Sequence, residues 1–89
     1  MKIKLELFGA SRDFSDKGHL ELEVQDKASV DDLRNEIIKY LDKNFKGNES
    51  FIKVVKSSAF CSENNEIISD NYKITKDQII GIIPPIGGG

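Results

Sequence analysis

The sequence has little of what most metal and disulfide sites require. It contains one cysteine, Cys61, and one histidine, His19, among 89 residues. A lone cysteine cannot form an intramolecular disulfide, and one thiol with one imidazole is too few ligands for a structural zinc site. The sequence therefore predicts neither a disulfide framework nor a bound metal.

Long apolar runs and an excess of basic residues are also missing. The first residues alternate charged and aliphatic side chains, where a signal peptide needs an unbroken apolar stretch, and nothing approaches the ~18 apolar residues of a membrane span. Thirteen Lys and Arg stand against fifteen Asp and Glu, so no surface is predicted to neutralise several phosphates. We expect no nucleic-acid partner, no membrane partner and a cytoplasmic location.

The chain is also short for an enzyme. Its 89 residues make one domain and bury only about 60–65 % of the unfolded surface, which is too little to enclose a deep catalytic cavity. The charged residues, 31 % of the chain, carry both signs, as in globular proteins. Function must therefore rest on one small core, and an autonomous enzyme is not expected.

Strand patterns are present near both ends of the chain. Residues 2–8 place aliphatic side chains on one side and charged ones on the other, and residues 20–24 repeat the pattern as an expected hairpin partner. Residues 79–83 are apolar at successive positions, which predicts a central strand covered on both faces. Further strands are predicted at 51–55, 59–61 and 67–68.

A helix is predicted to begin after Ser29. The Ser29 hydroxyl can accept a hydrogen bond from the first turn, while Asp31 and Asp32 favour the positive end of a helix. Apolar residues then recur every three or four positions, so one stripe should pack on a sheet while Arg34 faces water. The helix is expected to end near Lys43. The stripe consists of Val30, Leu33, Ile37, Tyr40 and Leu41.

This order of elements fits an α+β fold in which one main helix lies across one face of a mixed sheet of four or five strands, the β-grasp or ubiquitin-like architecture. Pro84 and Pro85 have no N–H to donate, so the sheet must stop there. The prediction is a domain over 1–83 and a tail over 84–89. The tail ends in three glycines, and its distinctive chemical group is the α-carboxylate of Gly89.

Three blocks of the sequence carry a resemblance to a known family. They are residues 7–14 (Leu-Phe-Gly-Ala-Ser-Arg-Asp-Phe), residues 29–34 (Ser-Val-Asp-Asp-Leu-Arg) and residues 82–89 (Ile-Ile-Pro-Pro-Ile-Gly-Gly-Gly). The chain resembles the MoaD/ThiS sulfur-carrier family, and most closely its molybdopterin synthase small subunits. The blocks span nearly the whole chain, and the Pro-Pro-x-x-Gly-Gly ending is the most specific of them.

The resemblance implies a non-catalytic carrier that binds no cofactor itself. A partner adenylating (E1-like) enzyme would use ATP to activate the carboxylate of Gly89, and sulfur transfer would give a thiocarboxylate. The tail, with Gly87 and Gly88, would then insert into the large subunit of molybdopterin synthase, in a heterotetramer. The family's region around Phe8 helps to form the partner interface, although a Phe there is also ordinary core. Further candidate partner contacts are Pro84, Pro85 and Ile86, an apolar base beneath the tail that could instead simply end the strand.

Other interpretations remain open. A carrier for thiamine or tRNA thiolation and a ubiquitin-like modifier that attaches Gly89 to lysines would share this ending, and a plain interaction domain would not use it. The segment 57–71 is longer than usual in the family, which leaves the particular partner open. Cys61 could relay a persulfide, although lone cysteines are more often small apolar fillers. His19 is expected to lie in a polar loop.

Overall fold

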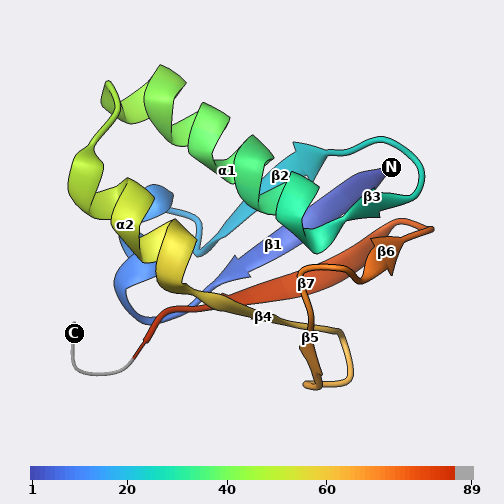
Figure 1. Ribbon diagram of the computed structural model, residues 1–89. Coiled ribbons are helices and arrows are strands. Elements are labelled where there is room, and N and C mark those ends of the chain that lie inside the picture. The colour runs from blue at the N-terminus through green and yellow to red at the C-terminus, as the bar shows by residue number, and fades with distance from the viewer. Residues whose placement is uncertain (86–89) are drawn as a thin grey trace.

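The computed structural model describes residues 1–85 and consists of a twisted sheet with two α-helices on one of its faces (Figure 1). The main sheet has five strands in the order β2-β1-β7-β4-β5. β1 and β7 are parallel, and the other neighbours are antiparallel. The strands are β1 (Lys2–Leu7), β2 (His19–Glu23), β4 (Ala59–Cys61), β5 (Ile67–Ile68) and β7 (Gln78–Ile83).

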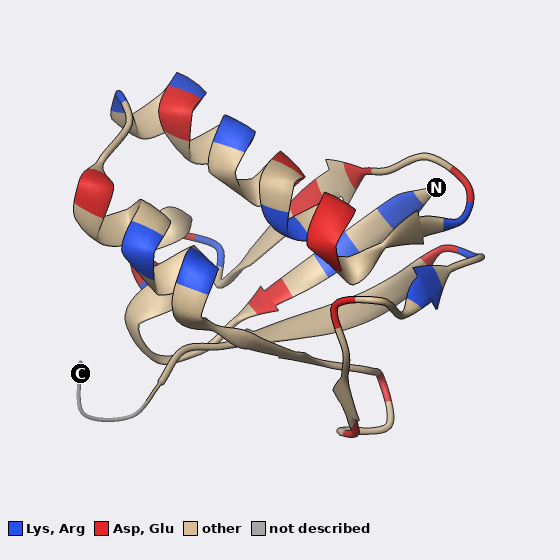
Figure 2. Ribbon diagram, in the orientation of Figure 1, with Lys and Arg blue, Asp and Glu red and all other residues tan. Residues whose placement is uncertain are grey.

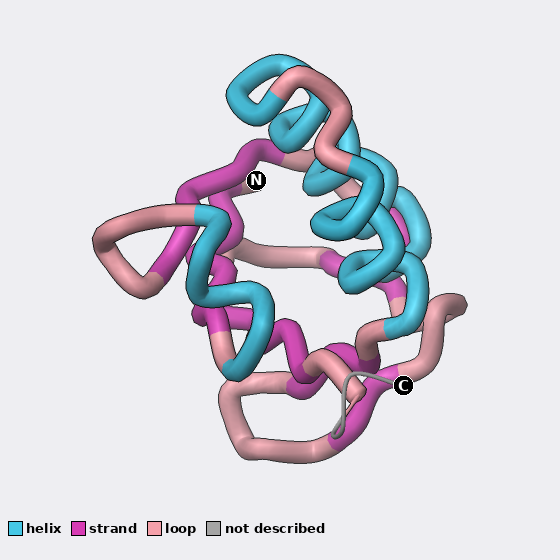
Figure 3. Tube along the Cα trace, turned by 90° about the vertical axis from the view of Figure 1, so that its left-hand side faces the viewer, coloured by secondary structure: helices cyan, strands magenta, loops and turns pink. Residues whose placement is uncertain are grey.

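The remaining elements are two α-helices, one 3-10 helix and a second, two-stranded sheet. Figure 3 shows from the side that most of the helical chain lies on one side of the strands. This arrangement confirms the predicted β-grasp architecture. The elements are η1 (Gly9–Phe14), β3 (Ala28–Ser29), α1 (Val30–Phe45), α2 (Glu49–Ser57) and β6 (Lys73–Ile74), with β3 paired to β6.

Alternate side chains of β1 and β7 point toward the helices and form one side of the hydrophobic core. Leu5 of β1 and Ile80 of β7 are directly paired and fully buried beneath the helices. Because successive side chains of a strand point to opposite faces, the same alternation sends Lys4 and Ile79 to the other face. The predicted hairpin of β1 with β2 and the central place of β7 are both confirmed.

The start of α1 is capped as the sequence predicts. The Ser29 hydroxyl accepts a hydrogen bond from the Asp32 N–H (3.1 Å), and the Asp32 carboxylate accepts one from the Ser29 N–H (2.9 Å). These bonds to Ser29, the backbone one foremost, lower the pKa of Asp32. The helix extends to Phe45, two residues beyond the expected end. The stripe residues Val30, Leu33, Ile37 and Leu41 are fully buried.

The prediction of a strand at residues 51–55 is wrong, because these residues lie in α2. The Asn48 side chain accepts a hydrogen bond from the Phe51 N–H (3.1 Å) and so caps the helix. The Phe51 ring packs against Phe14 and Phe45, each at 5.1 Å between centroids, and Val55 is fully buried. A short apolar run fits either period, and here the cap and the aromatic contacts select the helix.

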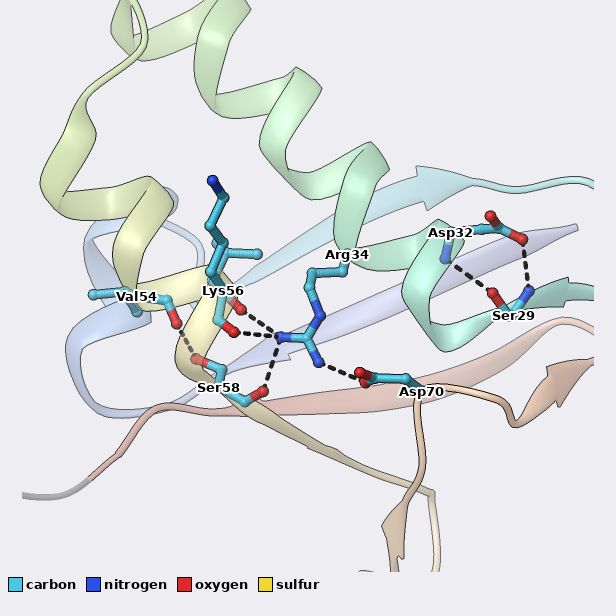
Figure 4. A network of polar contacts seen from close by, with 8 residues as sticks. Ser29, Asp32, Arg34, Val54, Lys56, Ser58 and Asp70 are labelled. Atoms are coloured by element: carbon cyan, nitrogen blue, oxygen red, sulfur yellow. Dashed lines mark hydrogen bonds and ion pairs between the residues drawn. The ribbon is translucent and has the colours of Figure 1, made fainter.

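Arg34 was expected to face water, and this is also wrong. Its guanidinium donates to the carbonyl oxygens of Val55 (2.6 Å) and Ser58 (2.9 Å) and pairs with the Asp70 carboxylate (2.7 Å), as Figure 4 shows. The last carbonyls of a helix lack partners within the helix, so a cation there satisfies them. Arg34 thereby joins α1 to the end of α2. Its guanidinium also lies 4.8 Å from the centroid of the Phe60 ring.

Among residues 1–85, no helix covers the sheet face away from α1 and α2, here called the outer face (Figure 1). The prediction that the last strand is covered on both faces is therefore wrong at Ile79, which is 36 % exposed. His19 begins β2 instead of lying in a loop. Within residues 1–85, neither helix is long and apolar enough to cross a bilayer.

Candidate functional site

The site begins where the chain leaves the sheet at the end of β7. Pro84 is buried directly after the strand, and Pro85 is exposed. A methyl group on the Cα of Gly9 would lie 3.8 Å from Cγ and Cδ of Pro84, so the proline ring packs against the start of η1. Gly9 has a φ of +55°, which favours glycine. Pro84 therefore anchors the base of the tail.

Phe8 lies beside this anchor, one residue before Gly9. Its side chain is 46 % exposed, which rules out an ordinary core role. A methyl group on the Cα of Gly81 would lie 3.0 Å from Cε2 of Phe8, so the ring rests on β7. The ring thus forms an apolar surface on the outer face, next to the point where the tail starts.

A local hydrogen-bonded turn fixes the backbone of Phe8. The Ser11 hydroxyl is fully buried, donates to the Phe8 carbonyl oxygen (2.6 Å) and accepts from the Phe8 N–H (2.9 Å). The Ser11 N–H also donates to the Phe8 carbonyl oxygen (3.1 Å). Both main-chain groups of Phe8 are therefore held by one serine, which directs the aromatic side chain to the outer face.

We call Phe8, Gly81 and Ile83 the tail-base patch. Gly81 and Ile83 alternate with the core residues of β7 and so lie on the outer face, with Ile83 partly exposed. Cys61 is paired with Gly81 across the β4–β7 ladder and is 7 % exposed. The patch lies on the strand from which the tail departs, so a protein that binds the tail also meets the patch.

Of the residues that the sequence singled out, the structure brings Phe8 and Pro84 together across Gly9. Ile86 and the three glycines at 87–89 lie outside the described residues, and the division of the chain at residue 84 stays a prediction. The sequence reasoning missed Gly81 and Ser11. A single glycine inside a strand, which often marks a close approach, was the available signal for Gly81.

No second reactive group gathers in the described part of the chain. Residues 1–85 contain no group of three His, Cys, Asp or Glu side chains that could hold a metal ion. The His19 ring lies 4.0 Å from the Glu21 carboxylate, which is exposed. Asp31 and Asp32 lie in the first turn of α1, where they complement the helix dipole. The tail base is therefore the best candidate site.

A family comparison decides what kind of chain this is. The model of the ThiS family matches residues 5–89, almost the whole sequence. The chain belongs to the ThiS family. Its members are small sulfur carriers or ubiquitin-like modifiers, and such a carrier is typically non-catalytic. No curated protein matches the sequence significantly.

Solved structures similar to this ThiS-family chain support the fold. A Pyrococcus furiosus protein assigned as molybdopterin converting factor subunit 1 has a TM-score of 0.70 and 24% identity, covering 97% of this chain and 99% of its own. Two structures of small archaeal modifier protein 1 from Haloferax volcanii have TM-scores of 0.68 and 0.67 at 15% and 13% identity. They cover 100% and 96% of this chain, and 100% and 98% of their own.

Proposed function

We propose that this chain is a sulfur carrier of molybdopterin biosynthesis, the small subunit of a molybdopterin synthase. The observation that carries the proposal is that the family match runs through the glycines to Gly89. This segment follows a proline, Pro84, that is anchored beside η1. In the proposal the reactive group is the α-carboxylate of Gly89, and the folded part of the chain holds and presents it.

The proposed loading reaction belongs to a partner enzyme. A carboxylate is an anion at neutral pH and a poor electrophile, so it needs activation. A carboxylate oxygen of Gly89 attacks the α-phosphorus of ATP in an adenylating (E1-like) enzyme, and pyrophosphate leaves. A hydrosulfide ion released by a sulfur donor then attacks the acyl carbon, AMP leaves with the electron pair of the C–O bond, and loss of the proton on sulfur gives a thiocarboxylate. ATP is thus a substrate of the partner, and this chain supplies the acyl group.

The tail and its base suit delivery into another protein. Gly87 and Gly88 have no side chains, so this segment can enter a narrow active site. Residues 86–89 span at most about 14 Å when fully extended. A partner that acts on Gly89 must therefore approach the end of β7. The proposed partner contacts are Phe8 and Pro85, which are exposed, and Ile86.

The proposed recipient is the large subunit of molybdopterin synthase, in a heterotetramer, where the sulfur passes to cyclic pyranopterin monophosphate. Similarity to the Pyrococcus furiosus protein over nearly the full length of both chains supports this choice. The Pro84-Pro85 pair before the glycines also favours it, because thiamine-pathway carriers resemble the chain but lack the pair.

Mass spectrometry tests the proposal directly. After incubation with the adenylating enzyme, ATP and a sulfur donor, the C-terminal peptide should gain the mass difference between sulfur and oxygen. A chain lacking Gly89 should keep the circular dichroism spectrum and thermal unfolding of the full chain but gain no sulfur. An unchanged C-terminal mass in the full chain contradicts the proposal.

A second candidate function is protein modification, in which Gly89 is joined to lysines of target proteins. The observation that favours it is the full-length similarity to the Haloferax volcanii small archaeal modifier protein. A blot against an N-terminal tag, made from cells that express the chain, separates the two functions. A ladder of conjugates that disappears when Gly89 is deleted indicates a modifier, whereas a single band agrees with a carrier.

A further inference from the structure

Gly81 occupies a position where the backbone does not require glycine. It lies inside β7, and its φ is not in the left-handed region, unlike those of Gly9, Gly18 and Gly47. Glycine in the middle of a strand weakens the strand, since it gives up chain entropy and packs no side chain. The reason for Gly81 must therefore lie in what surrounds its Cα.

Two side chains crowd the place that a Cβ of Gly81 would fill. A methyl group there would lie 2.8 Å from Sγ of Cys61 and 3.0 Å from Cε2 of Phe8, closer than carbon contacts normally allow. Both neighbours are side chains, which can rotate away. An alanine at this position would therefore displace the Cys61 sulfur and the edge of the Phe8 ring and leave the backbone of β7 in place.

The burial of Cys61 indicates that the Phe8 ring packs against the sheet at Gly81. Cys61 points to the outer face, which has no helical layer, yet it is only 7 % exposed. Its neighbours across the sheet are Gly81 of β7, which has no side chain to shield it, and Ile67 of β5, which is itself 67 % exposed. The Phe8 ring reaches the same point above Gly81 as the Cys61 sulfur, so the ring contributes to this cover from the Gly81 side.

Because the tail is short, a partner that binds Gly89 must lie close to the Phe8 ring. The four residues after Pro85 extend at most about 14 Å, and Phe8 lies one residue from Gly9, the residue on which Pro84 packs. An enzyme that draws Gly89 into its active site must therefore cover the tail-base patch. Adenylation is the step that carriers and modifiers share, so the occupant is the adenylating enzyme.

We propose that Gly81 is a positioning residue: its missing side chain lets the Phe8 ring pack on the sheet, and the adenylating enzyme docks on the ring in this position. This inference rests on the proposed activation of Gly89. It assigns to Phe8 a contact that depends on Gly81, so the two residues must act as one unit in binding.

The position of the ring is tested without any partner. Phe8→Ala and Gly81→Ala should each raise the rate at which iodoacetamide alkylates Cys61 in the native protein. In Gly81→Ala, the nuclear Overhauser contacts between the Phe8 ring and the Hα of residue 81 should weaken. Slow alkylation and retained ring contacts in Gly81→Ala would overturn the positioning role.

The binding test uses a Cys61→Ala background. This change removes the Sγ atom that a side chain at position 81 would otherwise meet, so the protein should still fold when Gly81 is replaced by alanine. Calorimetric titration with the adenylating enzyme should show about ten-fold weaker binding for Phe8→Ala and for Gly81→Ala, as for a central interface side chain. The two changes combined should weaken binding no further than either alone. Tyr72→Ala, at an exposed aromatic residue beside β6, should bind like the background protein.

Phe8→Leu provides a second measurement that leaves Gly81 intact. It should fold normally and weaken binding, because leucine keeps the apolar character but lacks the flat ring. Unchanged affinity in both Phe8→Leu and Gly81→Ala overturns this inference even when the full chain gains a thiocarboxylate. Weakened binding by a chain that gains no sulfur overturns the sulfur-carrier proposal and leaves Gly81 as a positioning residue.

Discussion

The same strands build both faces of the sheet, but the two faces follow different rules. On the covered face, apolar residues such as Leu5 and Ile80 are fully buried under α1 and α2. Lys and Glu residues alternate along β1 and belong to the outer face, whereas β4 and β7 contain no charged residue (Figure 2). Apolar residues on the outer face, such as Ile67 at 67 % exposure, do not serve the core. The covered face holds the fold together, and the uncharged half of the outer face is available for a partner.

The largest expected effect on stability comes from a substitution on the covered face. Leu5→Ala removes a fully buried side chain at the centre of β1 and should lower the free energy of unfolding by about 3 kcal/mol, through lost burial and a cavity. Lys4→Ala, at the preceding residue, which lies on the outer face, should change the free energy of unfolding by less than about 0.5 kcal/mol. Urea unfolding followed by circular dichroism measures both. Equal losses would contradict the division between the faces.

The covered face is also the part that the sequence predicts well. Alternation along residues 2–7 identifies the buried side chains of β1 without knowledge of any other element. Residues 51–55 form a short apolar run with β-branched residues, which favours a strand. Their helix depends on aromatic contacts with Phe14 and Phe45, which come from segments distant in the sequence. Periodicity alone carries no information about such neighbours.

The next effect concerns the attachment of the helices to the covered face. Arg34→Met keeps an unbranched side chain but removes the hydrogen bonds to the Val55 and Ser58 carbonyls and the pair with Asp70. We expect a loss of about 2 kcal/mol, because buried carbonyl oxygens lose charged donors. Lys39→Met, at an exposed residue of the same helix, is the matched control and should cost less than about 0.5 kcal/mol.

Thermal and urea unfolding of Arg34→Met and Lys39→Met measure this difference. Amide exchange adds a local measurement, since α2 should lose protection more than β1 does. If both variants unfold like the parent chain, Arg34 is only a surface cation, as its place in the helical pattern first indicated. The network would then contribute nothing to holding α2.

The candidate site is less predictable than the covered face. The sequence singled out Phe8 through a family resemblance and Pro84 as part of an apolar base beneath the tail, but their meeting across Gly9 appears only in three dimensions. Gly81 is separated from Phe8 by more than seventy residues of sequence, and only the parallel pairing of β1 with β7 brings them together. A local pattern shows that a glycine is unusual in a strand, but it does not show which side chain uses the space.

The smallest expected effect compares the two faces at adjacent residues of β5. Ile68 packs against the core cluster, whereas Ile67 points to the outer face. Thr keeps the β-branched shape, so Ile68→Thr should cost about 1 kcal/mol through a half-buried hydroxyl, and Ile67→Thr less than about 0.5 kcal/mol. Urea midpoints of the two variants measure the difference. If Ile67→Thr costs as much as Ile68→Thr, exposed apolar residues on the outer face also stabilise the fold, and the division between the two faces is wrong at β5.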